Sequence, residues 1–348
     1  MISLFQRGPP VRTCCGMRDQ MRAGKEEGHV RAEEYADHLD ALTHELKSVI
    51  VGQDEVIGQM ITALSAGGHV LLEGVPGIAK TLLIQTLARC IEGSFARIQF
   101  TPDLLPADIT GTRIFRQTDG CFTTVRGPIF HHFVLADEIN RAPPKVQSAL
   151  LEAMQERQVT IQGDTFPLED PFFVLATQNP IESEGTYPLP EAQTDRFMFK
   201  VLMGYPSLEE EVTILDRFTG ESGPEPRAVT DIATLLAIRS HVRSIRADRS
   251  VKEYAASIVD ATRHPAALIP DMEGYIAFGA SPRASLSLIL GAKGRAVMQG
   301  RTYIVPHDVK EVAHPSLRHR IIRTYEAEAE GVSTDRIIDR ILQNVPVP

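Results

Sequence analysis

One stretch decides the fold of this 348-residue chain: GVPGIAKT, which is Gly74, Val75, Pro76, Gly77, Ile78, Ala79, Lys80 and Thr81. An apolar run, Val70 to Leu72, precedes it, and a helical pattern, Leu82 to Ile91, follows it. This strand, loop and helix order is typical of a phosphate loop, in which backbone N–H groups at a helix N-terminus hold an anion. Lys80 would reach the β and γ phosphates of ATP, and the Thr81 hydroxyl would bind Mg²⁺.

Ala79 departs from the usual form of this loop, which has glycine before the lysine. Alanine is small, so we expect the backbone to approach phosphate closely, provided that φ at Ala79 is negative. The alternative is a glycine-rich turn that exposes Lys80 and binds nothing. The strand before the loop and the helix after it favour the phosphate site.

Short apolar runs alternate with helical patterns on both sides of the loop, which predicts a parallel sheet flanked by helices. We therefore expect an α/β P-loop NTPase core. The predicted strands are Val70 to Leu72, Ala96 to Phe100, Phe133 to Ala136, Phe172 to Thr177 and Phe199 to Met203. Two further stretches contain turn residues and read as β-hairpins, namely Thr112 to Val125 and Gln158 to Leu168.

The pattern divides the chain into four parts. Residues 1–30 lack a helical or strand period and are predicted to be a disordered extension. Residues 31–205 form the nucleotide-binding domain, residues 206–226 a linker rich in Gly and Pro, and residues 227–348 a smaller, all-helical lid domain. Predicted helices are Ala32 to Leu46, Asp54 to Ala66, Asp231 to Val242, Lys252 to Thr262, Pro282 to Met298 and Pro306 to Val312.

Two adjacent carboxylates, Asp137 and Glu138, directly follow the predicted strand Phe133 to Ala136. Ligands of parallel α/β sheets bind at the carboxyl ends of the strands. Asp137 would hold Mg²⁺ through its water shell, and Glu138 would polarise the attacking water. A solvated strand end is the simpler explanation of such a pair, but the phosphate loop upstream favours the catalytic one.

Asn179 ends the next strand at the same edge, where its amide could hold the hydrolytic water beside the γ-phosphate. The alternative is an asparagine that serves the turn before Pro180. Arg196 is a candidate finger that acts on the nucleotide of another subunit, because its planar guanidinium suits the charge of a γ-phosphate. It could instead pair with Asp195 or Glu191, and Arg141 is a second candidate.

Arg283 begins the predicted helix Pro282 to Met298, and we expect it to point back toward the nucleotide. A cation is unfavourable at a helix N-terminus, which indicates an anionic partner. An ordinary surface ion pair is the alternative.

The composition limits the class of protein. A net charge of −9 argues against a surface that neutralises many phosphates of a nucleic acid. The four cysteines show no metal-ligand spacing, and no apolar run is long enough for a signal peptide or a membrane span. These features predict a cytoplasmic protein that is not in the membrane.

Taken together, the motifs resemble the MoxR family of AAA+ ATPases over residues 40–325. The resemblance rests on Val51 to Gln53, Gly74 to Thr81, LADEINRAPPKVQSALLEAMQE at Leu135 to Glu156, Ala176 to Pro180, LPEAQTDRFMF at Leu189 to Phe199, and Ala280 to Arg283. Ala79 looks like the family's own form of the loop. The resemblance implies further nucleotide contacts from Val51, Gly52 and Leu82.

It also implies a ring, expected to be a homo-hexamer, with ATP between subunits and Arg196 completing the site of the neighbour. Members look like chaperone-type remodellers that mature or activate a partner complex, often beside a protein with a von Willebrand factor A domain. The hairpin Gln158 to Leu168 resembles the family's pre-sensor insertion, and Asp103 to Val125 resembles its helix-2 insertion. Both would face a pore or a substrate.

Three other functions share these residues. A motor subunit of a metal-chelatase complex would have the same nucleotide site. A nucleic-acid ring motor is disfavoured by the acidic balance and the absence of Trp. A nucleotide switch without turnover is disfavoured because Glu138, Asn179 and Arg196 are all present.

Overall fold

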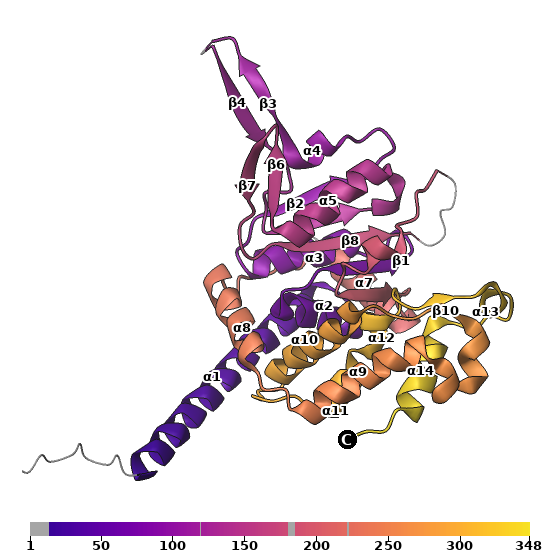
Figure 1. Cartoon of the computed structure of the whole chain (residues 1–348). Coiled ribbons are helices and arrows are strands. Elements are labelled where there is room, and N and C mark those ends of the chain that lie inside the picture. The colour runs from indigo at the N-terminus through magenta and orange to yellow at the C-terminus, as the bar shows by residue number, and fades with distance from the viewer. Residues whose placement is uncertain (1–13, 119, 180–184, 221–222) are drawn as a thin grey trace, which may run out of the picture.

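The computed structural model describes residues 14–118, 120–179, 185–220 and 223–348, with side chains from residue 32 onward. Its centre is a five-stranded parallel sheet in the order β2-β5-β8-β1-β9 (Figure 1). The strands are β1 (Val70–Gly74), β2 (Phe95–Gln99), β5 (Phe133–Asp137), β8 (Phe173–Gln178) and β9 (Phe199–Met203). All five predicted strands are confirmed, and the predicted neighbours β5 and β8 pair in register.

The two faces of the sheet are buried by different helices. Successive strand residues point to opposite faces, so Val134 and Val174 lie in a core with helix α5 (Pro144–Glu156). Leu135 and Leu175 lie in a larger core on the other face, shared with α2 (Asp54–Ala66), α3 (Lys80–Cys90) and the C-terminal helices. Burial on both faces explains why the strands read as continuous apolar runs.

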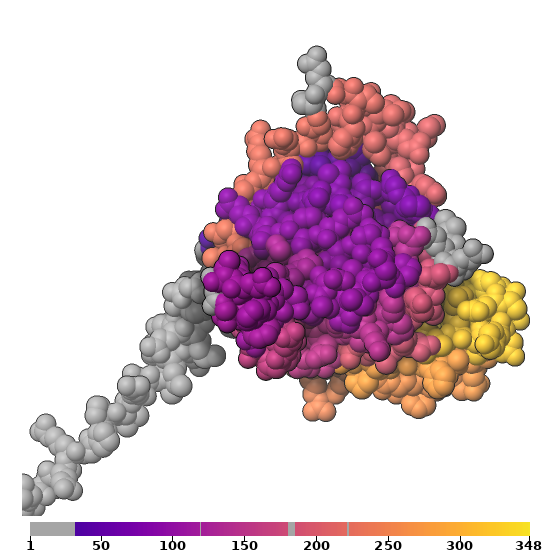
Figure 2. Space-filling view, turned by 90° about the horizontal axis from the view of Figure 1, so that it is seen from above, coloured from indigo at the N-terminus to yellow at the C-terminus, as the bar shows by residue number. Residues whose placement is uncertain are grey.

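Both predicted hairpins are present and project from the same end of the molecule, toward the viewer in Figure 2. One hairpin is β3 (Gly111–Arg116) with β4 (Cys121–Arg126), and the other is β6 (Gln158–Ile161) with β7 (Asp164–Pro167). An ion pair of 3.2 Å between Arg113 Nη1 and Asp164 Oδ2 joins them. The short helix α4 (Pro106–Thr110) leads into β3.

The C-terminal part is mostly helical and lies beside the α/β domain (Figures 1 and 2). Its helices are α8 (Ile232–Ser244), α9 (Arg249–Arg263), α10 (Pro282–Met298), α11 (Pro306–Glu311), α12 (Ala313–Leu317), α13 (Tyr325–Ala329) and α14 (Thr334–Asn344). The prediction of an all-helical lid is wrong in one detail, because β10 (Ile276–Phe278) pairs with β11 (Ile322–Arg323). These strands are too short to show the alternation of apolar and polar residues by which a strand is predicted from sequence.

Two segments that were predicted to lack regular structure, residues 1–30 and 206–226, contain helical residues. Helix α1 (Cys14–Val49) begins inside the extension expected to be disordered, where Met, Arg, Gln, Lys and Glu supply helix propensity without an apolar stripe. Residues 1–13 lie outside the described part of the chain. Helix α7 (Leu208–Phe218) occupies much of the expected linker, and a capping box between Ser207 and Glu210 starts it. Within the described residues, no helix is long and apolar enough to cross a membrane.

Candidate active site

The phosphate loop connects the end of β1 to the start of α3. Lys80 Nζ donates a hydrogen bond back to the carbonyl oxygen of Gly74, which closes the loop. Ala79 is the N-cap of α3 and has φ 62°, so the condition of a negative φ at this residue is not met. Its carbonyl accepts the first helical hydrogen bond, from Leu83 N at 3.0 Å. The left-handed turn therefore directs the chain into the helix at the residue where other loops of this kind use glycine.

The loop forms one side of a cavity of about 280 Å³ at the carboxyl edge of the sheet. Four segments contribute to it, namely the three that the sequence predicted and strand β2. The lining residues are Pro76, Gly77, Ala79, Lys80, Thr81, Arg97, Asp137, Glu138 and Asn179. The Thr81 hydroxyl and the Asp137 carboxylate are oxygen ligands on the same cavity, which is the donor type that Mg²⁺ prefers. The residues present thus fit a Mg²⁺ bound together with phosphates.

A buried threonine fixes the two acidic residues. Thr177 Oγ donates to Asp137 Oδ1 at 2.7 Å and accepts from the backbone N–H of Glu138 at 2.8 Å. Glu138 itself has φ 55°, a left-handed conformation that turns the chain out of the strand. Sequence reasoning missed Thr177, although a polar residue at the end of an apolar strand is a usable signal.

Strand β2 supplies two further partners that sequence reasoning missed. Arg97 donates to Asp137 Oδ2 through Nε at 3.0 Å and Nη2 at 2.7 Å. Gln99 Nε2 donates to Glu138 Oε2 at 2.7 Å, and the same oxygen accepts from Arg141 Nη1 at 2.9 Å. Both carboxylates are therefore held by side chains of their own chain. Arg97 and Gln99 are two residues apart on a strand next to β5, which brings both to this edge.

Asn179 lies where the sequence predicted. It follows β8, which pairs with β5 in the sheet, and it is 5% exposed. It lines the same cavity as Glu138.

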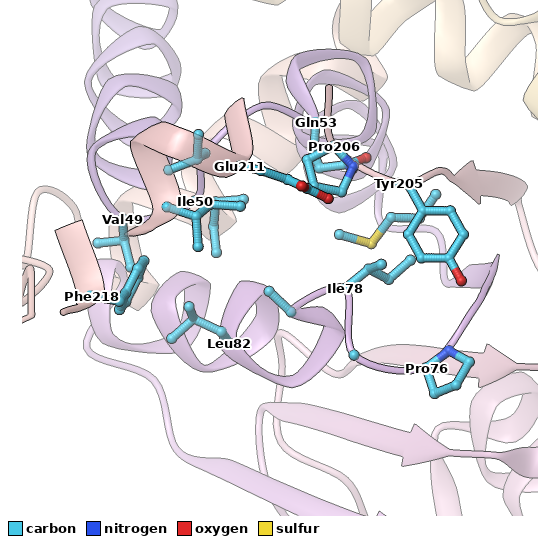
Figure 3. Close-up of a pocket in the computed structure, with 15 residues that line it drawn as sticks. Val49, Ile50, Gln53, Pro76, Ile78, Leu82, Tyr205, Pro206, Glu211 and Phe218 are labelled. Atoms are coloured by element: carbon cyan, nitrogen blue, oxygen red, sulfur yellow. The ribbon is translucent and has the colours of Figure 1, made fainter. Parts of the chain in front are cut away.

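A second, more apolar cavity of about 370 Å³ adjoins the first (Figure 3). Side chains from the end of α1, the start of α3 and helix α7 surround it. The lining residues are Val49, Ile50, Val51, Gln53, Pro76, Gly77, Ile78, Ala79, Leu82, Met203, Tyr205, Pro206, Glu211, Ile214 and Phe218. Pro76, Gly77 and Ala79 line both cavities. A nucleotide could therefore place its flat heteroaromatic base in the apolar cavity and its phosphates in the other one.

Three of the expected nucleotide contacts line neither cavity. Gly74 ends β1, where its carbonyl oxygen accepts the hydrogen bond from Lys80. Gly52 does not line either cavity, and its φ is 67°. A Cβ at Gly52 would lie 2.5 Å from Glu210 Oε1, so this glycine makes room for the residue that caps α7. Val75 packs against the larger core instead of lining a cavity. Val51, Ile78 and Leu82 do line the apolar cavity.

The two candidate arginines lie together, away from the phosphate cavity of their own chain. Arg196 and Arg283 both line a cavity of about 300 Å³ on another side of the sheet. Arg196 Nε donates to Gln155 Oε1 at 3.0 Å, and Arg283 Nη1 lies 3.9 Å from Asp195 Oδ2. The expectation that Arg283 points toward the nucleotide of its own chain is therefore wrong.

The position of Arg283 follows from the packing of the lid. Helix α10 packs so closely on β9 that a Cβ at Gly291 would lie 2.8 Å from Phe199 Cζ. Ser281, the N-cap of α10, donates to Asp195 at 2.9 Å, which fixes the start of the helix. The direction of α10 thus depends on tertiary contacts that periodicity does not show.

Comparisons with known proteins agree with this geometry. Residues 69–199 match the family described as ATPase family associated with various cellular activities (AAA), and residues 271–341 match the AAA lid domain. Chaperone MoxR1 of Mycobacterium tuberculosis is 51% identical over 311 residues, which are 89% of this chain and 82% of that protein. Protein MoxR of Methylorubrum extorquens is 28% identical over 342 residues, covering 92% and 98% of the two chains.

A crystal structure of a Cytophaga hutchinsonii protein superposes with a TM-score of 0.87 at 45% identity, covering 94% of this chain and 99% of that one. The similarity to MoxR1 thus exceeds 50% identity over most of the length of both chains. The chain therefore belongs to the MoxR family of AAA+ ATPases and is an ATPase.

Proposed function

We propose that this chain assembles into a ring, expected to be a hexamer, with Mg-ATP bound between subunits and Arg196 completing the site of a neighbour. The observation that carries the proposal is the separation of the two arginines from the phosphate cavity. Arg196 and Arg283 line one cavity, whereas Lys80 and Glu138 line another. An arginine that serves ATP but is remote from its own phosphate loop needs a second copy of the chain.

Within one site, each group has a distinct task. Lys80 would neutralise the β and γ phosphates, and Thr81 and Asp137 would hold Mg²⁺, which adds positive charge where the phosphates carry negative charge. Glu138 would orient and polarise the attacking water, helped by Asn179. Both hydrogen bonds to Glu138 Oε2 would have to rearrange before that oxygen could face water.

The same geometry supports a role for Arg141 within its own chain. Its Nη1 lies 2.9 Å from Glu138 Oε2, at the catalytic carboxylate of the same subunit. Arg196 has no such contact with the phosphate cavity and is therefore the better candidate for the residue that acts on the neighbour.

The proposed cellular role is remodelling of a protein partner. One relative carries the name chaperone, and the paired hairpins project from the body of the domain, where they could contact a client. Their projecting side chains include Phe115 and Phe122, which are 54% and 61% exposed and could contact apolar segments of a client. A protein with a von Willebrand factor A domain is the proposed client class, and a metal-chelatase partner is the alternative.

The test is ATP turnover as a function of protein concentration, for wild type, Glu138→Gln, Arg196→Ala and a mixture of the two variants. Turnover per subunit should rise with concentration, and each variant should lose it by a factor of about 10³ or more. Mixing should restore part of the activity, because some interfaces then combine an intact Glu138 with an intact Arg196. Arg249→Ala, at a 92% exposed side chain, is the matched control and should be fully active. If wild-type turnover does not depend on concentration and Arg196→Ala remains active, the shared site is wrong.

A further inference from the structure

A fourth cavity, rich in arginine, lies between the α/β domain and the lid helix α8. It has a volume of about 340 Å³ and is lined by Gly67, Arg157, Leu168, Asp170, Leu236, Arg239, Ser240 and Arg243. The α/β domain supplies Arg157 and Asp170. Helix α8 supplies Arg239 and Arg243, which are four residues apart and hence on one side of the helix.

Arg239 is a buried cation whose hydrogen bonding is incomplete. Its side chain is 9% exposed, and Nε donates to the carbonyl oxygen of Leu64 at 2.9 Å. Nη1 lies 3.8 Å from Asp170 Oδ1, beyond hydrogen-bond distance. Nη2 is buried and has no hydrogen-bond partner among the described residues. A buried donor without an acceptor costs free energy, so an acceptor in the cavity would be stabilising.

Arg157 holds its position without using Asp170 as a close partner. It donates to the carbonyl oxygens of Phe172, at 2.8 Å, and Gly67, at 3.2 Å. Its Nη1 lies 3.6 Å from Asp170 Oδ1. The one carboxylate that lines the cavity therefore lies beyond hydrogen-bond distance of both Arg157 and the buried Arg239.

The charges around the cavity do not balance. The three arginines and the one aspartate that line the cavity carry a net charge of +2. Burial and the repulsion of Arg157 lower the pKa of Arg239 to about 10, so the site destabilises the positive charge that it contains. A dianion would compensate this charge, whereas a single carboxylate would leave one positive charge.

We propose that this cavity binds an oxyanion of the phosphate class, bridging Arg239 and Arg243 of the lid to Arg157 of the α/β domain. Guanidinium groups match tetrahedral oxyanions in geometry, and the bound dianion would cross-link the two domains. The cavity shares Gly67 and Arg157 with the one that contains Arg196 and Arg283, so the anion would lie beside that site. The inference does not rest on the proposed ring or on its arginine finger.

The experiment uses the full chain with Lys80→Ala and Arg196→Ala, which weaken anion binding at the phosphate cavity and at the cavity of Arg196 and Arg283. Isothermal titration with sodium phosphate, at constant ionic strength set by sodium chloride, measures the affinity. Arg243→Gln in this background removes an exposed arginine from the cavity with little risk to folding. Arg249→Gln, on the next helix, is the matched control.

We expect saturable binding of phosphate. Arg243→Gln should weaken this binding about tenfold or more, because hydrogen bonds between charged groups are strong. Arg249→Gln should leave the affinity unchanged. A parallel titration with AMP distinguishes the source: binding of AMP but not phosphate, with the same dependence on Arg243, assigns a phosphate ester. Absence of binding by both, or equal affinity in Arg243→Gln, would overturn the proposal. Equally tight binding of acetate would overturn the phosphate assignment in favour of a carboxylate.

Discussion

Replacement of Ala79 by glycine should stabilise this protein, which is unusual for an alanine next to a helix. Ala79 has φ 62°, and an L-residue in the left-handed region costs about 1–2 kcal/mol. Glycine removes that cost but adds about 0.5–1 kcal/mol of backbone entropy in the unfolded chain. The difference is a stabilisation of about 0.5–1 kcal/mol. No side-chain packing is lost, because Ala79 is exposed at the cavity.

Urea unfolding of the nucleotide-free protein, followed by circular dichroism, measures this free energy. Ala256→Gly is the matched control, because Ala256 is exposed in the middle of α9 and its replacement should destabilise by about 1 kcal/mol. The two substitutions remove the same methyl group but should change stability in opposite directions. Equal destabilisation by both would refute the left-handed conformation of Ala79 as the origin of the effect.

Three further predictions concern other sites. Burial lowers the pKa of His69 to about 3, so between pH 6.5 and 5 this histidine is protonated in the unfolded chain and neutral in the folded one. The free energy of unfolding should therefore fall by about 2 kcal/mol over this range. Its dependence on pH should be weaker in His69→Gln. Burial raises the pKa of Cys90 to about 12, so iodoacetamide at pH 8 should label the exposed Cys121 before Cys90, as peptide mapping can show. Gly52→Ala, at φ 67° and with its Cβ 2.5 Å from Glu210, should lower the unfolding free energy by about 1–2 kcal/mol.

Each of these has a clear contrary result. A pH profile that is the same in His69→Gln would remove that histidine as a cause. Faster labelling of Cys90 than of Cys121 would show that the thiol is accessible. Unchanged thermal unfolding of Gly52→Ala would mean that the left-handed turn tolerates a side chain without cost.

The core of the fold could be predicted from the sequence because the determining signals are local. Strands such as β5 are continuous apolar runs, and the phosphate loop is a contiguous motif, so Lys80, Thr81, Asp137 and Asn179 could be placed on one sheet edge. Helix α7 was missed although its capping signal, Ser207 and Glu210, was present. The turn glycines likewise marked the two hairpins.

The remainder depends on contacts between distant segments. Arg97 and Gln99 reach the acidic pair only through the register of β2 beside β5. Arg283 lies away from the phosphate cavity because α10 docks on β9, which no periodicity within α10 encodes. The conformation of Ala79 could not be read from its residue type, since alanine in a left-handed turn opposes its usual preference.

Helix α5 connects the acidic pair to the β6–β7 hairpin. It begins at Pro144, close after Glu138, and ends at Glu156, just before the hairpin of β6 and β7. Its 13 residues make a rod about 20 Å long. A tilt of about 10° about its N-terminal end, which lies near Glu138, would therefore move its C-terminal end by about 3 Å. The ion pair between Arg113 and Asp164 would pass that displacement to the second hairpin. Distances between spectroscopic labels on the β6–β7 hairpin and on α2, measured with and without ATP, would record this displacement.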